Sequence, residues 1–326
     1  MFHRTAGFSR MRDDEFMTRR ELASFLSTLS FGPAQACRNL TVMPLLAPHV
    51  IPSGLLTLDE ALTRCLAEVT EVSEEGDVPH LLFLNHGDHP ILMIDGEELV
   101  GARQNRILNL SILAPGRRSL EIPVSCVEQG RWAWNSRRFT TSDRIIYAKL
   151  RRANVEAVSA SLRRRGRRHT DQHQVWSSVS AKSVRLNACS DTWAAGALYE
   201  RHAADINDFV AAFVATDGQV GAAFLVDGRL AGLEVFGATD LLSRLLPKVV
   251  RGYALDALDD EAWGTAHEVS LDAAAALSAL GRSRAARHRA IGLGEDLRLS
   301  GQGLVGAGLI AEGKVIHLTA YANTYV

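Results

Sequence analysis

The sequence predicts an α+β fold with mixed or antiparallel sheets, β-hairpins and a central helical segment. Three observations indicate this class. Residues 78–127 form short β-type runs separated by turn residues, residues 142–213 have the spacing of amphipathic helices, and residues 220–236 and 305–321 share one hairpin pattern. Hairpins favour antiparallel pairing, whereas strands that alternate with crossover helices would predict a doubly wound parallel sheet.

Residues 1–35 are predicted to form an N-terminal leader that contains one helix. Between residues 14 and 29, large apolar residues recur at about helical spacing, namely Phe16, Leu22, Phe25 and Leu29. Beyond this leader the chain contains no clear linker, so we expect residues 36–326 to form a single domain.

Short strands separated by turns are predicted in the first half of this domain. A strand at 39–45 precedes a helix, or a turn and a helix, at 57–70. The next β-type runs occupy residues 81–85, 91–94, 106–113 and 121–127, with turn residues at 86–88, 95–96 and 114–116. We expect the turn at 114–116 to join its neighbours as a hairpin, which would bring residues 97–106 and 123–131 side by side.

Helices are predicted in the middle of the chain. Ser142 or Asp143 can cap a helix, and a second helix follows Asp191. The apolar face of the first of these helices carries Ile146, Leu150, Ala153 and Ala157.

The last third contains two similar hairpin segments. Residues 220–236 turn at Asp227 and Gly228, and residues 305–321 align with them without a gap. Both turn at an acidic residue followed by glycine and a basic residue, so we interpret them as two copies of one unit paired in a single sheet. Helices are expected between them, near 239–257 and 260–281.

The composition is that of a globular protein and excludes several classes. Net charge is −1 and charged residues make up 22% of the chain, so no overall field favours nucleic acid or membrane. No apolar run approaches the roughly 20 residues that cross a bilayer, and the N-terminus lacks the apolar core of a secretory signal. Four scattered cysteines without a C-x-x-C pair indicate a reducing, cytoplasmic location.

The segment 96–132 is the candidate site, because ionisable groups there alternate with strands. Glu97, Glu98 and Glu128 are candidates for general acid–base catalysis or for holding a divalent ion such as Mg²⁺. Arg106 and Arg131 suit bidentate contact with carboxylate or phosphate. The alternative is a set of Arg–Glu pairs that lock neighbouring strands, and both descriptions hold if these pairs shape the site.

Two neighbouring features are open to simpler explanations. Cys126 has no histidine nearby in sequence, and Glu128 would disfavour a thiolate, so we predict that Cys126 is not a nucleophile. Trp132 and Trp134 would share one face of an extended segment, where a place in the core is the stronger prediction and stacking on a base the weaker one. His317 is expected to be structural.

A basic tract runs from Lys149 to Arg168 and contains eight basic residues and one acid, Glu156. It can contact nucleic acid or a phosphate-rich ligand, but the neutral overall charge favours a solvated helix end and loop. Because the tract contains Gly166, we expect it to fray. The chain has no GxxxxGK[ST], GxGxxG or HExxH motif, so the common nucleotide and zinc fingerprints are absent from the sequence.

Several segments resemble the bacterial ARPP domain, the domain associated with ADP-ribosylglycohydrolases and rhodanese-phosphatases. The similar segments are residues 39–45, 57–62, 95–113, 122–132, 171–176 and 228–237. The resemblance implies a role in NAD and ADP-ribose metabolism and a protein partner encoded nearby. Carried onto this chain, its motif positions are Glu97, Glu98, Gln104, Asn105, Arg106, Cys126, Glu128, Arg131 and Trp132, with a second group at Asp171, Gln172 and Trp176.

Together the residues and the resemblance indicate a phosphorylated nucleotide as ligand. Gln104, Asn105, Arg106, Arg131, Trp132, Gln172 and Trp176 would bind it, and the three glutamates would act on it. A non-catalytic binding or scaffold module is the alternative from another class, and nucleic-acid contact through the basic tract is a third. The sequence defines neither a metal-ligand set nor a reaction.

Overall fold

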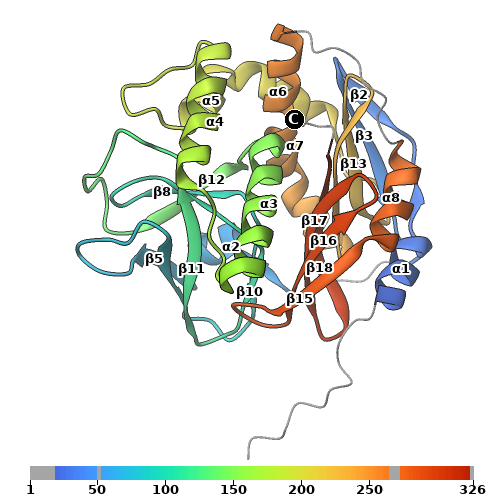
Figure 1. Ribbon diagram of the computed structural model, residues 1–326, viewed down its shortest axis with the longest axis horizontal. Coiled ribbons are helices and arrows are strands. Elements are labelled where there is room, and N and C mark those ends of the chain that lie inside the picture. The colour runs from blue at the N-terminus through green and yellow to red at the C-terminus, as the bar shows by residue number, and fades with distance from the viewer. Residues whose placement is uncertain (1–18, 50–52, 264–271, 324–326) are drawn as a thin grey trace, which may run out of the picture.

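A large sheet and a group of smaller sheets face each other across a layer of helices (Figure 1). The computed structural model describes residues 19–49, 53–263 and 272–323. The helices are α1 (Arg19–Thr28), α2 (Leu58–Thr63), α3 (Ala148–Arg165), α4 (Gln172–Arg185), α5 (Gly196–Arg201), α6 (Ala203–Ala212), α7 (Thr239–Trp263) and α8 (Ala273–Arg282). The predicted α+β class is confirmed.

The large sheet has the order β1-β3-β13-β14-β18-β17-β16-β15, and β2 also pairs with β3. Its strands are β1 (Ser30–Phe31), β2 (Gln35–Cys37), β3 (Leu40–Leu46), β13 (Gln219–Val226), β14 (Arg229–Phe236), β15 (Arg284–Arg289), β16 (Glu295–Gly301), β17 (Leu304–Ala311) and β18 (Lys314–Ala322). The two predicted hairpins, β13–β14 and β17–β18, pair with each other through β14 and β18, which confirms one sheet.

Both hairpins turn through two residues in the left-handed region. Asp227 and Gly228 have φ of 49° and 72°, and Glu312 and Gly313 have φ of 52° and 68°. Such turns match the twist of antiparallel strands, and glycine adopts the second position without a steric penalty. The repeated acid-glycine pair therefore explains the repeated hairpin.

Residues 56–145 form the smaller sheets. One sheet has the order β12-β8-β9-β11-β6-β5 and the other β10-β7-β4. Their strands are β4 (Leu56–Thr57), β5 (Ala67–Glu71), β6 (His80–Asn85), β7 (Ile91–Met93), β8 (Glu97–Gly101), β9 (Arg106–Leu108), β10 (Ile112–Ala114), β11 (Ser119–Cys126) and β12 (Phe139–Ile145). As predicted, residues 97–106 and 123–131 neighbour each other, through β9 and β11.

The turn at 114–116 does not make the predicted hairpin. β10 pairs with β7, whereas β11 pairs with β6 and β9, so the chain changes sheets at this turn. A Cβ added to Gly116 would lie 2.1 Å from the carbonyl oxygen of Asp88, and this close approach fixes the crossing.

Two helix predictions are also wrong in extent. The expected helix at 57–70 ends at Thr63, because Cys65 turns into the left-handed region (φ 55°) and β5 follows. The helix expected from Ser142 begins at Ala148, since 139–145 pairs with β8 as a strand. In the last third, α7 contains the first predicted helix and continues to Trp263, and α8 covers residues 273–281 of the second; residues 264–271 lie outside the described residues.

The helices α3 and α7 lie between the sheets, and α8 packs on the other face of the large sheet with α1 against it. Leu22, Leu26 and Leu29 of the predicted leader are buried in the larger core. The remainder of the predicted leader helix, residues 14–18, lies outside the described residues. No described helix is both long enough and apolar enough to span a membrane.

Candidate functional site

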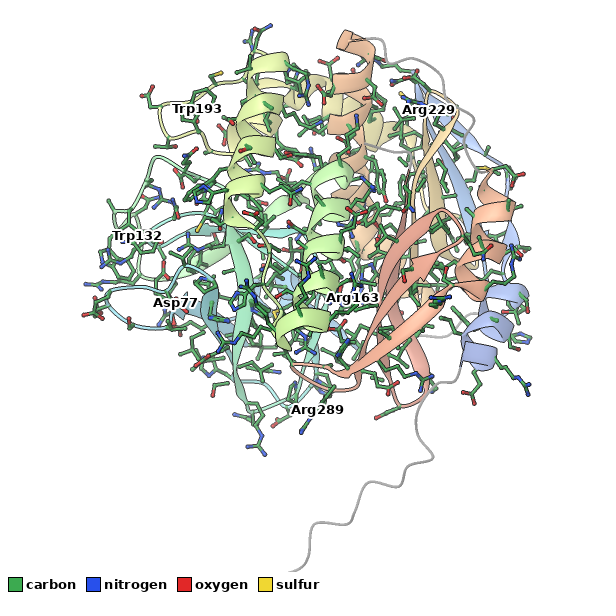
Figure 2. The ribbon with its side chains drawn as sticks, viewed as in Figure 1. Asp77, Trp132, Arg163, Trp193, Arg229 and Arg289 are labelled. Atoms are coloured by element: carbon green, nitrogen blue, oxygen red, sulfur yellow. The ribbon has the colours of Figure 1, made fainter. Side chains whose placement is uncertain are left out.

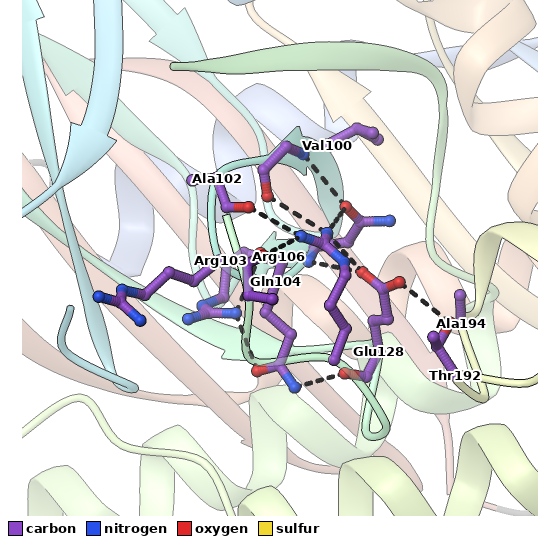
Figure 3. A network of polar contacts seen from close by, with 12 residues as sticks. Val100, Ala102, Arg103, Gln104, Arg106, Glu128, Thr192 and Ala194 are labelled. Carbon is purple, nitrogen blue, oxygen red and sulfur yellow. Dashed lines mark hydrogen bonds and ion pairs between the residues drawn. The ribbon is translucent and has the colours of Figure 1, made fainter. Parts of the chain in front are cut away.

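Arg106 is the centre of the candidate site. In β9 it pairs with Cys126 of β11 and Leu99 of β8, and its side chain is 0% exposed. Its Nη1 donates to the backbone and side-chain oxygens of Gln104, each at 3.0 Å (Figure 3). Among the described residues, its Nε and Nη2 have no hydrogen-bond partner. Burial therefore lowers the pKa of Arg106, and two of its donor atoms lack an acceptor.

Glu71, at the end of β5, supplies the carboxylate beside Arg106 (3.9 Å from Oε1 to Nη2). Oε1 accepts a hydrogen bond from the backbone of Arg103, whereas the buried Oε2 has no partner. Burial raises the pKa of Glu71, and the charge of Arg106 opposes this shift without cancelling it. Glu71 is absent from the residues predicted for the site, because the pattern of residues 57–70 predicts a helix there rather than β5. The alternation of Ala67, Val69 and Glu71 on the buried side of a strand would have indicated it.

Arg131 and Glu128 hold the loop between β8 and β9. Arg131 Nη2 lies 2.6 Å from Glu128 Oε2, and its guanidinium donates to the carbonyls of Gly101 and Ala102. Asn105 accepts a further hydrogen bond from Arg131 at 3.0 Å. These contacts engage both terminal nitrogens of Arg131 within the protein, and the expectation that Arg131 binds a ligand stays a prediction.

Glu128 is saturated in the same way. It accepts hydrogen bonds from the backbone of Asn105 at 3.2 Å and from Thr192 Oγ1 at 3.0 Å, and its backbone carbonyl accepts from Gln104 (Figure 3). Burial alone would raise the pKa of Glu128, but the hydrogen bonds from Arg131, Asn105 and Thr192 lower it. A carboxylate held ionised in this way is a weak base and a poor acid.

A ladder of arginine and tryptophan side chains leads from Arg106 to the surface. The guanidinium carbons of Arg106 and Arg103 lie 5.5 and 5.7 Å from the Trp132 ring. Arg103 also lies 4.8 Å from the Trp134 ring, and Arg137 lies 4.6 Å from that ring. Trp132 is 44% exposed. The expectation of a core position is therefore wrong for Trp132, because the segment after β11 is a surface loop rather than a continuing strand.

The second motif group meets the first through the backbone of Cys126. The Gln172 amide accepts from the Cys126 N–H and donates to its carbonyl, each at 2.8 Å. Asp171 caps α4, which places Gln172 at its first turn. Trp176 lies one turn further on, where its buried Nε1 has no partner and its ring meets His173 edge-on at 5.8 Å.

Cys126 is buried beneath these groups. Burial raises the pKa of its thiol to about 11, although the nearby charge of Arg106 acts in the opposite direction. A thiol with this pKa is almost fully protonated at neutral pH, which supports the prediction that Cys126 is not a nucleophile.

Glu97 and Glu98 do not converge with Arg106 and Glu128. They are consecutive in β8, so their side chains point to opposite faces of the sheet. Glu97 pairs with Lys248 of α7 at 2.9 Å, and Glu98 pairs with Arg144 of β12 at 2.6 Å. Burial raises the pKa of both glutamates. The expected convergence holds for the strands but is wrong for these two side chains, since each is held by its own cation.

The ARPP-1 family model, described as the ARG and Rhodanese-Phosphatase-superfamily-associated Protein domain, matches residues 28–321. The chain belongs to the ARPP-1 family. The match includes both motif groups and the two hairpins. No curated protein and no solved structure matches the chain.

A second polar cluster of this ARPP-1 chain lies deep between the sheets. Arg151 of α3 donates from Nε to Asp95 at 3.0 Å, and both of its terminal nitrogens donate to Glu234 of β14, Nη2 at 3.3 Å. His317 contacts Glu234 at 3.1 Å and Ser111 at 2.7 Å. Burial alone would lower the pKa of Arg151, but Asp95 and Glu234 raise it well above its usual value. The predicted structural role of His317 fits this closed network.

Two cavities lie away from Arg106. One of about 630 Å³ opens between α3, α4 and α7 and is lined by paired charges such as Lys182 and Asp259, 2.8 Å apart. The other, of about 300 Å³, lies beside His80 and His169. Within the described residues, no group of three or more His, Cys, Asp or Glu side chains is arranged to hold a metal ion. The Mg²⁺ expectation therefore has no ligand set to support it in this part of the chain.

Proposed function

We propose that this ARPP-1 chain is a binding module for a phosphorylated nucleotide of the ADP-ribose class, with the phosphate at Arg106. One observation carries the proposal. Arg106 is fully buried, yet its Nε and Nη2 have no acceptor in the part of the chain that the structure describes. A buried donor without a partner costs about 1–3 kcal/mol. A phosphate oxygen pair would remove that cost, because the guanidinium fork matches it in geometry and charge.

Trp132 is the cover of this site in our proposal. Its ring lies 5.5 Å from the Arg106 guanidinium and reaches solvent, and in this proposal rotation of the Trp132 side chain admits the ligand to Arg106. The base of the ligand then stacks on Trp132 or on the guanidinium plane of Arg103, as bases do on aromatic rings and arginines. The family's association with ARG and rhodanese-phosphatase proteins supports an ADP-ribose-type ligand, without defining a reaction.

The carboxylates favour binding over catalysis. Glu97, Glu98 and Glu128 were the expected catalytic groups, and each is engaged by a cation within 2.9 Å. We assign them positioning roles within this proposal. Glu71 is the carboxyl group next to Arg106 that keeps a free oxygen and a raised pKa, so a proton exchanged with the ligand would involve Glu71.

Calorimetric titration of ADP-ribose tests the proposal. The variants are Arg106→Lys, which keeps the charge but loses the fork, and Trp132→Ala. The matched control is Trp193→Ala, a second tryptophan that is 36% exposed and lies outside the ladder. We expect Trp132→Ala to lower affinity by about tenfold or more, since one stacked base contributes about 1–3 kcal/mol. Arg106→Lys should weaken binding further, and Trp193→Ala should not change it.

Equal affinity in the Arg106→Lys variant and the wild type would contradict the phosphate assignment. Equal losses in Trp132→Ala and Trp193→Ala would contradict the ladder as the base site. Chromatography of the nucleotide after incubation with the wild type separates binding from catalysis, because a binding module returns ADP-ribose intact.

A further inference from the structure

The end of α3 presents four exposed arginines, namely Arg163, Arg164, Arg165 and Arg167. The expectation that this segment frays is wrong. The helix continues to Arg165, and Gly166 ends it in the left-handed conformation (φ 64°), as a C-cap glycine does. The arginines are therefore displayed from a regular helix end.

The first half of the basic tract has a different role. Lys149 pairs with Asp260 at 2.8 Å, Arg151 is buried against Asp95 and Glu234, and Arg152 pairs with Glu156 at 3.0 Å. Lys149 and Arg151 hold α3 against α7, β14 and Asp95, whereas Arg152 is paired within the helix itself. Only the last turn of the helix and the residue beyond Gly166 are left to face a partner.

A second arginine-rich segment lies at the edge of the large sheet. β15 is the last strand of that sheet and has the sequence RAARHR. Arg284, Arg287 and Arg289 are exposed. Its three arginines are far in sequence from the basic tract, so no local pattern connects the two segments.

The fold brings the two segments together. Arg168, directly after the helix end, donates to the carbonyl oxygen of Arg289 across 121 positions of sequence and pairs with Asp296 of β16 at 2.9 Å. Figure 2 shows Arg163 and Arg289 on the same side of the molecule, at the lower ends of α3 and β15. We name this surface the arginine face, made of Arg163, Arg164, Arg165, Arg167, Arg284, Arg287 and Arg289.

Few acids neutralise the arginine face. Within the described residues, none of its arginines has an ion pair with an acidic side chain, and Glu295 acts on Arg287 at longer range. The effect reaches His169, whose pKa is lowered by burial, by His80 and by the charges of Arg167 and Arg165. The chain as a whole carries a net charge of −1, so this positive charge is local.

We propose that the arginine face binds the phosphodiester backbone of single-stranded nucleic acid. This goes beyond the nucleotide site at Arg106 and does not depend on it. Unpaired arginines on one surface attract and bind phosphates, and an edge strand lets a chain run along the sheet.

The cavity of about 300 Å³ at this face favours a single strand. Its lining includes Arg167, Arg168, the acid Glu121 and the rings of His80 and His169, whose centroids are 5.7 Å apart. An unpaired base can stack on planar rings that lie next to arginines. The bases of a duplex are already stacked on each other and are not accessible in this way. A membrane-binding surface would need several exposed apolar side chains that insert into the lipid. Among the described residues near β15, Leu293, at 39% exposure, is the large apolar side chain that is exposed, so a membrane is the less favoured partner.

Fluorescence anisotropy with labelled oligouridine and oligodeoxythymidine tests the proposal, with a DNA duplex and anionic phospholipid vesicles as comparison probes. Three variants each lose three arginines to alanine. The helix variant changes Arg163, Arg164 and Arg165, the strand variant changes Arg284, Arg287 and Arg289, and the matched control changes the exposed Arg20, Arg64 and Arg201.

We expect the wild type to bind both single strands and to lose affinity as salt rises from about 50 to 200 mM. The helix and strand variants should each bind about tenfold or more weakly, with the salt slope reduced by about 2, since each lost phosphate contact changes it by about 0.7. The control should match the wild type. A strand variant with lysines in place of its arginines should keep most of the slope, which shows that charge rather than misfolding is responsible.

Three outcomes would overturn the proposal. They are absence of oligonucleotide binding by the wild type at low salt, equal weakening in the control variant, and binding to vesicles or duplex in preference to single strands. The ADP-ribose titration reports on Arg106 independently, so failure of one proposal is distinguishable from failure of the other.

Discussion

Arg106 and Arg151 are both fully buried arginines, but they differ in how completely they are paired. Arg151 has two carboxylates within hydrogen-bond distance, and their charges raise its pKa. Arg106 has no carboxylate closer than 3.9 Å among the described residues, two donor atoms without acceptors, and a lowered pKa. One cluster is complete within the protein, and the other lacks an acceptor.

This difference indicates a structural role for Arg151 and a ligand-binding role for Arg106. Removing one member of a complete buried network leaves the other charges uncompensated, which costs several kcal/mol. Removing an incompletely paired charge relieves a cost that the folded protein already bears. Replacing Arg151 should therefore lower the stability of the protein. The same replacement at Arg106 should lower the affinity for the ligand and leave stability nearly unchanged.

The largest effect is expected for Arg151→Met. Asp95 and Glu234 would remain buried without their cation, so the free energy of unfolding should fall by about 3–5 kcal/mol. Urea unfolding followed by circular dichroism measures this change. The surface variant Arg138→Met, which breaks the 2.9 Å pair between the exposed Arg138 and Glu68, is the control and should cost about 1 kcal/mol or less. If Arg151→Met lowered the free energy of unfolding by less than the control does, the network would not hold the sheets together.

Arg106→Met should affect binding rather than stability. Methionine fills the volume and removes a poorly paired charge, so the free energy of unfolding should stay within about 1.5 kcal/mol of the wild type or rise. Affinity for ADP-ribose should fall by about a hundredfold, the effect of losing roughly 2.7 kcal/mol of charge-assisted hydrogen bonding. A strongly destabilised Arg106→Met protein would place Arg106 in the same structural class as Arg151 and remove the basis of the proposed function.

Glu71→Gln should make ADP-ribose binding tighter and less dependent on pH. The pKa of Glu71 in the free protein lies above the ordinary value of 4.5, and a phosphate beside it would raise that pKa further. The complex therefore binds the proton more tightly, so wild-type affinity should be highest at low pH and fall as pH rises through the raised pKa. At neutral pH the variant should bind about tenfold tighter, a gain of about 1.4 kcal/mol.

The same linkage predicts the effect of Glu71 on stability. Because its folded pKa is above the unfolded value, the wild type is most stable relative to Glu71→Gln at low pH and loses that advantage as pH rises through the folded pKa. The matched control is Glu75→Gln, at an exposed position in the loop that follows β5. Affinities that depend equally on pH in all three proteins would exclude Glu71 from the site.

Patterns local in sequence predicted much of the fold. The acid-glycine turns gave both hairpins, and their similarity gave the shared sheet. Pairing between distant segments was beyond such patterns, because the residues that cause it are not neighbours in sequence. The change of sheet at Gly116 depends on Asp88, and the end of α2 depends on the left-handed turn at Cys65.

The candidate site was predicted in the same partial way. Arg106, Gln104 and Glu128 were found because one segment carries them. Glu71 was missed because its strand was assigned to a helix, and Lys248 was missed because it is buried against Glu97 from a helix about 150 positions away. Adjacent glutamates in sequence indicated a shared role, but strand geometry separates their side chains. Residue type and spacing can locate a site in the sequence. Which of its charged side chains remain unpaired depends on the ion pairs that they form in the folded protein.

The smallest effect is expected for Cys126→Ser. The thiol contacts the centre of the candidate site, but its pKa of about 11 leaves about one part in 10⁴ as thiolate at neutral pH. ADP-ribose affinity should therefore stay within about twofold of the wild type, because the backbone of Cys126, which Gln172 holds, is unchanged.

A protein in which Cys37, Cys65 and Cys189 are serine isolates this thiol for labelling with a disulfide reagent. Labelling should be slow in the folded protein and rapid in urea, since the group is 0% exposed. Rapid labelling of the folded protein that ADP-ribose blocks would instead place a reactive thiol in the site beside Arg106, and the site would then have to be described as catalytic.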